Sequence, residues 1–218
     1  MKLKQNVLLA CTVLIAITST IITFALLTYE TDTLVNTFTV GEVALKLDET
    51  DVDETGTPIP NATRVISNEY KLIPGKTYVK DPTMTVISGS EDSYVRMLVT
   101  ITKAKEIKEV LGSDFLPENY ITGWDKTKWL STSIKENQDN SITYEFRYYQ
   151  VVKGYINNQK QDIVLTPLFT NFTAPSKLNN EDLKKIEGFE IKVEGHGIQA
   201  TGFKSADEAW NAFEEESK

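Results

Sequence analysis

Hydrophobic and polar residues alternate along several short stretches of this chain, with the period of two that is typical of half-buried β-strands. The clearest stretch is 94–103, in which every odd-numbered position from Val95 to Ile101 is apolar. The stretch 142–152 alternates in the same way, which predicts a second long strand. Shorter strands are predicted at 69–72, 78–80, 83–87, 161–165, 166–173 and 189–193.

The stretch 34–47 contains two alternating pieces that meet at a glycine. Leu34, Phe38 and Val40 share one face before Gly41, and the apolar positions 43, 45 and 47 share one face after it. A change of phase at a glycine indicates two strand pieces joined by a bend or a bulge.

Turn residues suggest how some strands connect. The polar segment 154–160 predicts a turn that joins 142–152 to 161–165 as a long hairpin. Pro167 interrupts the next strand, and because proline cannot donate a main-chain hydrogen bond, this strand is expected at a sheet edge or a bulge. The segment DETDVDETGTPIPN at 48–61 is interpreted as an exposed acidic connection.

Three short helices are predicted. Residues 105–111 have helical spacing and Gly112 as a stop signal. A second helix is expected to open at Asn180 as its N-cap, with an acidic first turn. The last helix is expected to start at Ser205, where Glu208 three residues later completes a capping box.

Eight to ten short strands with two or three short helices, and no alternation of strands with crossover helices, predict an all-β fold. We expect a single jelly-roll or Greek-key β-sandwich, preceded by an N-terminal hydrophobic signal helix. The expected organisation is a signal peptide or membrane anchor at 1–28 and one β-sandwich domain at 29–218.

The first residues are expected to form a signal peptide or a membrane anchor. Residues 7–27 carry no charge and are long enough to span a bilayer, so composition fits either a cleaved signal or an anchor. Small residues place the cleavage site after Ala25 or after Thr28. Basic residues before the apolar run and acidic ones after it place the body outside the cell.

The charge of the body restricts its partners. The chain has a formal net charge of -8, and without Lys2 and Lys4 of the leader its 21 basic and 31 acidic side chains give -10. Nucleic acid is therefore not expected as a partner, and membrane contact is expected only through the leader. The single cysteine, Cys11, lies in the leader, so the body forms no disulfide of its own.

No motif for catalysis or metal binding is found. The chain has one histidine, His196, and contains neither HExxH nor GxSxG. Because alternation in the last predicted strand slips at Gly195 and Gly197, His196 is interpreted as marking a bulge. The 31 carboxylates are too many for a glycosidase pair to be singled out. We therefore predict no catalytic residue, no metal ligand and no cofactor.

Two further patterns each have a structural and a functional interpretation. Asp51, Asp53, Thr55 and Gly56 resemble the first half of a calcium loop, but Ala62 occupies the place of its closing glutamate. A solvated acidic turn is the favoured interpretation. The aromatic residues of 115–129 are expected to cover one end of the core, with a carbohydrate-stacking surface at Trp124 and Trp129 as the alternative.

Motifs at both ends of the chain resemble the TasA/camelysin family of exported Gram-positive proteins. LTYETDTLVNTFTVG at 27–41 and VALKL at 43–47 resemble the start of that family. IQATGF at 198–203 and ADEAW at 206–210 resemble its ending, and GSEDSYVR at 89–96 resembles its central strand. The usual Ala-Tyr or Ala-Phe junction is replaced by Leu-Thr-Tyr, which leaves the cleavage site open.

The resemblance implies a secreted or extracellular protein, associated with the cell wall or membrane, whose leader is cut by a SipW-type signal peptidase. It also implies a jelly-roll subunit of biofilm-matrix fibres, with itself and other matrix proteins as partners. The donated N-terminal strand would be 29–40, contributing Tyr29, Leu34, Phe38 and Val40 to a neighbouring copy.

Three alternatives remain open. The N-terminal strand can fold back into its own domain. Camelysin members have been interpreted as metallopeptidases, which here would need carboxylate ligands, since only His196 is available. The third alternative is a surface-adhesion module that uses Trp124 and Trp129.

Overall fold

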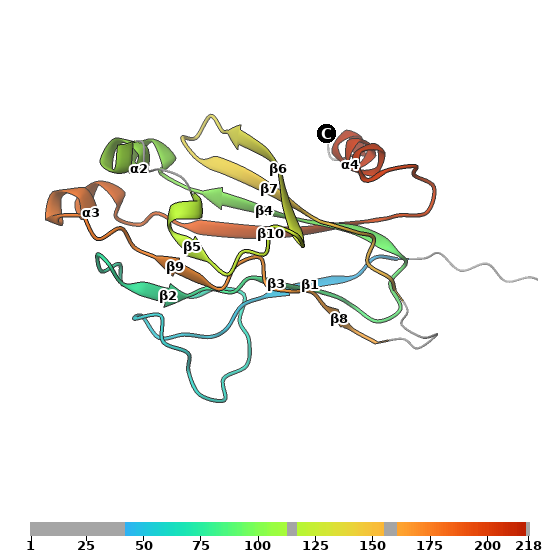
Figure 1. Cartoon of the computed structure of the whole chain (residues 1–218), viewed down its shortest axis with the longest axis horizontal. Helices are drawn as coiled ribbons and strands as arrows, with labels where there is room; N and C mark the ends of the chain where they lie inside the picture. The colour runs from blue at the N-terminus through green and yellow to red at the C-terminus, as the bar shows by residue number, and fades with distance from the viewer. Residues whose placement is uncertain (1–41, 113–116, 155–160, 217–218) are drawn as a thin grey trace, which may run out of the picture. The chain divides into compact units, whose positions relative to one another are not determined.

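The computed structural model describes residues 42–112, 117–154 and 161–216. Contacts group the chain into Met1–Val40 and Gly41–Lys218, and the fold described below is that of the second unit. It is mostly β-structure, arranged in three antiparallel sheets (Figure 1), which confirms the expected all-β class. In order across the sheets, the strands are β1 (Leu45–Asp48), β3 (Thr83–Val86) and β8 (Ile163–Val164); β10 (Ile191–Gln199), β4 (Ser93–Ile101), β7 (Ile142–Tyr148) and β6 (Trp129–Glu136); and β2 (Thr77–Val79), β9 (Asn171–Thr173) and β5 (Ile121–Thr122).

Helices lie at both ends of the long strands. The described helices are α2 (Ala104–Leu111), the 3₁₀ turn η2 (Pro117–Asn119), α3 (Asn180–Ile186) and α4 (Ala206–Glu216). Figure 1 shows α2 and α3 side by side at one end, where their apolar faces share a small cluster. At the other end, α4 covers the face of the four-stranded sheet that points away from the core.

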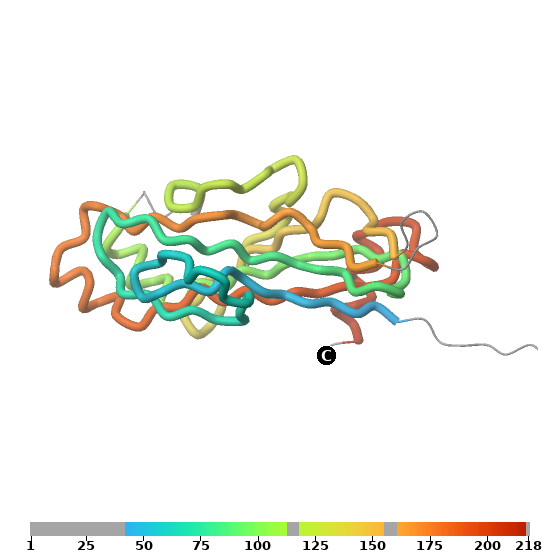
Figure 2. The backbone as a smooth tube through the Cα atoms, turned by 90° about the horizontal axis from the view of Figure 1, so that it is seen from below, coloured from blue at the N-terminus to red at the C-terminus, as the bar shows by residue number. Residues whose placement is uncertain are grey.

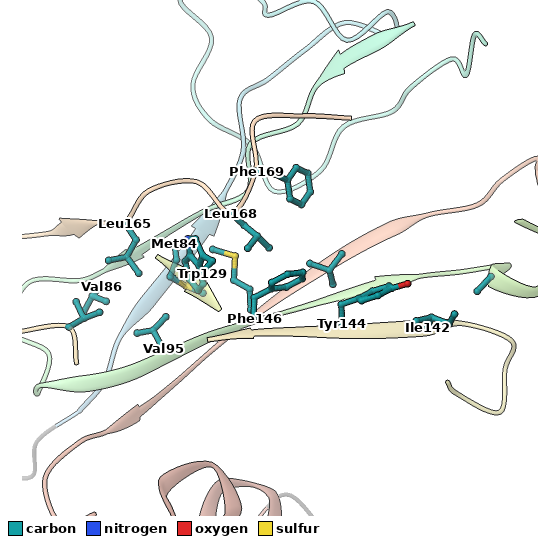
Figure 3. Packing of buried hydrophobic residues seen from close by; sticks show 14 residues of the cluster. Met84, Val86, Val95, Trp129, Ile142, Tyr144, Phe146, Leu165, Leu168 and Phe169 are labelled. Atoms are coloured by element: carbon teal, nitrogen blue, oxygen red, sulfur yellow. The ribbon is translucent and has the colours of Figure 1, made fainter. Parts of the chain in front are cut away.

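The core lies between the two larger sheets. Met84 and Val86 of β3 pack against Val95 and Met97 of β4, and Trp129 of β6 joins the same cluster with no exposed surface. Figure 3 shows the side chains of Met84, Val86, Val95 and Trp129 converging from both sheets. Because one cluster takes residues from both sheets, the two sheets pack face to face.

Strand β10 does not contain the predicted bulge. It pairs with β4 in unbroken register from Ile191 to Gln199. Gly195 and Gly197 instead allow close packing of the sheets: a Cβ at Gly195 would lie 2.2 Å from Met84 Cε, and one at Gly197 would lie 2.9 Å from Leu45 Cδ1. The alternation of apolar and polar residues is interrupted here because two inward-facing positions carry no side chain. The strand does not change the face that it turns to the core.

The predicted hairpin between 142–152 and 161–165 is also wrong. Strand β7 pairs with β4 and β6, whereas β8 pairs with β3 in the opposite sheet. The chain between them thus crosses from one sheet to the other. The true hairpin partner of β7 is β6, which sequence analysis missed because only Trp129 of its eight residues is buried, so no alternation marks it.

The long connection from β1 to β2 differs from its prediction. Asp48, Glu49 and Val52 are buried, so the beginning of 48–61 is not an exposed loop, and residues 69–72 form no strand. Figure 2 shows this connection as a compact cyan and teal loop that doubles back on itself.

The helix boundaries are close to those predicted. Gly112 ends α2 with a positive φ of 63°. The cap of α3 is Asn179 and not Asn180: its side chain accepts from the N–H groups of Glu181 and Asp182. At α4, Ser205 Oγ accepts from Glu208 N–H at 3.2 Å, as expected for its N-cap.

The tight contact at Gly195 generates a stability prediction. The substitution Gly195→Ala should lower the free energy of unfolding by about 1–3 kcal/mol, because the added methyl group forces the fully buried Met84 to move. Chemical denaturation measures this loss. The double variant Gly195→Ala/Met84→Ala should lose less free energy of unfolding than the sum of the losses in the two single variants, because the side chain that clashes is gone. Additive costs would contradict the packing argument.

Candidate functional site

The residues predicted to act in assembly and processing lie outside the described part of the chain. These are Tyr29, Leu34, Phe38 and Val40 of the expected donor strand, together with Ala25 and Thr28 at the expected cleavage sites. The structure therefore describes the surface that such a strand would meet, and not the strand itself.

That surface contains a groove of about 740 Å³ along one side of the sheets. One wall is formed by Glu190 and the first three residues of β10, which end at Val193. The end of β1, the segment 66–70 and Tyr78 of β2 form the other walls. The floor is apolar and includes Leu72, Phe172 and Ile191.

The groove opens because the spacing of the sheets changes along β10. At Gly195 and Gly197 the side chains of β1 and β3 rest directly on the β10 backbone. Towards the start of β10, the inward positions carry Val193 and Ile191, and β1 gives way to the long connection after Asp48. The glycine end is thus closed, and the opposite end forms the groove.

Two strand edges border this opening. Within the described residues, β10 pairs only with β4, and β1 pairs only with β3. The exception is a bridge between Glu49, just after β1, and Val65. Among the described strands, none pairs with the outer edge of β10, and a strand edge of this kind can add a further strand.

An exposed apolar side chain stands at the rim of the groove. Ile66 is 89% exposed and lines the opening. At the inner end, Leu72, Phe172, Phe189 and Ile191 separate the groove from an apolar cavity of about 80 Å³ beneath α2 and α3, and they line both. Such an apolar floor and rim suit an apolar segment better than a charged ligand.

A buried polar cluster forms part of the opposite wall. Lys80 Nζ lies 2.7 Å from Glu49 Oε2, and Asn68 Nδ2 donates to Glu49 Oε1 at 2.9 Å. The Tyr70 ring centroid is 5.7 Å from Lys80 Nζ. Burial, and then the charge of Glu49, raise the pKa of Tyr70 well above its usual value. Sequence analysis missed this cluster, because its members lie up to 31 positions apart without a motif.

Arg64 fixes the loop that carries this wall. Its guanidinium donates to Asp48 Oδ1 at 2.5 Å and to Asp81 Oδ2 at 2.9 Å. It also donates to Thr83 Oγ1 at 2.8 Å. One arginine thus ties the long connection to β1 and to the start of β3. Burial acts to raise the pKa of Asp48, but hydrogen bonds from Lys46 and then from Arg64 lower it below the usual value.

His196 lies on the face of the sheet that points away from the groove. Its Nδ1 accepts from Arg96, 3.2 Å from Nε, and its ring stacks on Phe213 of α4 at 5.0 Å. Arg96 is 3% exposed and also donates to Glu214 at 2.6 Å. The histidine therefore helps to dock α4.

The acidic segment 51–56, which resembles half of a calcium loop, forms a turn held by hydrogen bonds. Asp53 Oδ1 accepts from the backbone N–H groups of Thr55 and Thr57, as in a capped turn. Hydrogen bonding to Thr55 chiefly lowers the pKa of Asp53. Among the residues described, no group of three His, Cys, Asp or Glu side chains is placed to hold a metal ion.

Trp124 and Trp129 pack into the core, and Phe115 of the same stretch lies outside the described residues. Trp129 is fully buried and donates from Nε1 to the carbonyl of Thr166 at 2.9 Å. Trp124 packs edge-on against Phe146 with ring centroids 5.2 Å apart. A buried indole offers no face to a sugar. The alternative interpretation, a carbohydrate-stacking surface that includes Trp129, is therefore wrong.

Comparisons with models of protein families, with curated proteins and with solved structures give no match to this chain. Within the described ranges, no helix has the length and apolarity needed to cross a bilayer. The expected leader at 1–28 lies outside those ranges.

The environment of His196 generates a pH prediction. Burial first, and then the charge of Arg96, lower its pKa below the usual value of about 6.5, although Glu194, Glu214 and Glu145 act in the opposite direction. As the pH falls through the pKa of the unfolded histidine, the unfolded state gains a proton before the folded state does. The free energy of unfolding therefore decreases as the pH falls. Between about pH 7.5 and about pH 5.5, the free energy of unfolding should fall more in the wild type than in His196→Gln. Equal slopes in denaturant titrations would contradict this account.

Proposed function

We propose that this protein is a secreted structural subunit of the extracellular matrix or cell surface. It polymerises when the N-terminal strand 29–40 of one copy enters the groove of the next. The observation that carries the proposal is the groove itself, which has apolar residues on its floor and is bordered by the outer edges of β1 and β10.

The dimensions and pattern of the strand support this assignment. Twelve residues in extended conformation span roughly 40 Å, which exceeds the roughly 13 Å covered by positions 190–193, the part of the chain at the start of β10 that lines the groove. Main-chain hydrogen bonds to the edge of β10 would provide affinity. The alternate side chains Leu34, Phe38 and Val40 would lie over the floor and so fix the register.

The finer features proposed with this function are a jelly-roll topology, export through a cleaved leader, and assembly with itself and other matrix proteins. They rest on the sequence patterns and on the TasA/camelysin resemblance. A strand that folds back into its own domain would occupy the same groove without joining subunits. The metallopeptidase alternative predicts casein cleavage that a chelator abolishes, whereas a matrix subunit leaves casein intact.

Electron microscopy of two purified chains tests the assembly. A chain of residues 29–218 should form filaments, and a chain beginning at Gly41 should remain monomeric at the same concentration, because it lacks the strand to donate. Circular dichroism confirms that both are folded. If both stay monomeric while folded, the polymer proposal fails.

Ile66 provides a test of the acceptor side. The substitution Ile66→Asp removes the apolar rim at a position that is 89% exposed, so the fold itself should be unaffected. Loss of about 2 kcal/mol of apolar burial should weaken subunit association roughly thirtyfold, measured by sedimentation at increasing concentration. Ile59→Asp is the matched control, since Ile59 is 44% exposed and lies outside the groove. An equal effect of both substitutions would show that the groove is not the acceptor.

A further inference from the structure

We infer that Lys80 and Asn68 are placed to form an intramolecular amide bond, with Glu49 transferring the protons. The inference concerns the polar cluster in the groove wall and is independent of the proposed polymerisation. It assigns a self-modification that links the long connection after β1 covalently to the end of β2.

The first observation is that one carboxylate touches both reacting groups. Glu49 Oε2 lies 2.7 Å from Lys80 Nζ, and Glu49 Oε1 accepts from Asn68 Nδ2 at 2.9 Å. The side chains of Lys80 and Glu49 are 10% and 8% exposed. An amine and a carboxamide are thus held on the two oxygens of a single buried carboxylate.

The second observation is the orientation of the Asn68 carboxamide. Its Oδ1 accepts from the backbone N–H of Val52 at 3.0 Å. Its Nδ2 donates to the carbonyl of Thr50 at 2.9 Å as well as to Glu49. The nitrogen therefore faces the group that can protonate it. The Val52 N–H is positioned to stabilise negative charge that develops on Oδ1 during attack at Cγ.

These contacts define a balanced reaction. Glu49 takes a proton from the Lys80 ammonium, and the Nζ lone pair attacks Asn68 Cγ to form the new C–N bond. Glu49 then delivers its proton to Nδ2, the Cγ–Nδ2 bond breaks, and the second proton lost by Nζ leaves with the departing ammonium ion. The products are one amide bond and one ammonium ion, and Glu49 is again a carboxylate. No oxidant, metal or other reactant is required.

The surroundings favour this step. Holding the two groups on one carboxylate replaces a bimolecular encounter by a movement of the Lys80 side chain. The Tyr70 ring lies 5.7 Å from Nζ and covers part of the cluster. Glu49, Asn68 and Lys80 all line the groove, which provides an exit for ammonia.

Peptide mapping of the full chain tests the inference directly. Trypsin cleaves after Lys and Arg, so an unlinked chain yields the peptides 65–71, 77–80 and 81–96. A linked Lys80 resists trypsin, and the expected product is a branched species of 65–71 joined to 77–96. Its mass should be lower than the sum of the two peptides by one ammonia.

Three variants separate the cross-link from other sources of the same mass change. Glu49→Gln keeps the shape of the side chain but removes the proton carrier, and Lys80→Arg removes the nucleophile, so both should lack the branched peptide. Glu54→Gln, at an exposed glutamate of the same loop, should retain it. Wild-type chain that is folded by circular dichroism and yields only the three unlinked peptides after prolonged incubation would overturn the inference. The cluster would then be an ion pair only.

Discussion

The close approach of the sheets at Gly195 and Gly197 is the constraint on which the rest of the structure depends. Without side chains at these positions, Met84 and Leu45 lie directly on the β10 backbone, and the core closes at that end. The same strand carries Val193 and Ile191 towards its start, where the opposite sheet ends at Asp48. The space between the two sheets is therefore closed at the glycine end of β10 and open at the start of β10. The groove is a consequence of this difference in packing.

The strands that could be predicted from sequence are those with one buried face. Residues 94–103 and 142–152 alternate because one side of each strand contacts the core, and β4 and β7 lie within them. Strand β6 was missed because it is an edge strand with little burial. The hairpin error at 154–160 has a different cause: a local turn signal cannot show that β8 crosses to the other sheet, because pairing with β3 is a long-range choice.

Of the proposed assembly site, only the donor segment could be predicted from the sequence. The alternating segment 29–40 is visible as a pattern, whereas the groove proposed as its acceptor is built from residues of several distant segments. Glu49, Asn68 and Lys80 meet where the long connection folds back on β1, and Arg64 holds it there by hydrogen bonds to Asp48 and Thr83. Charged residues in such a loop are expected in solvent, so their burial depends on tertiary structure and leaves no local signal.

The central claim is that the groove beside β10 accepts the segment 29–40. Hydrogen exchange tests it most directly, with a chain that begins at Gly41 and a synthetic peptide of residues 29–40. Added peptide should slow exchange of backbone amides along the outer edge of β10 and leave those of α4 unchanged, because an added strand bonds only to that edge. Unchanged exchange in β10 at saturating peptide, with the fold intact, would contradict the account.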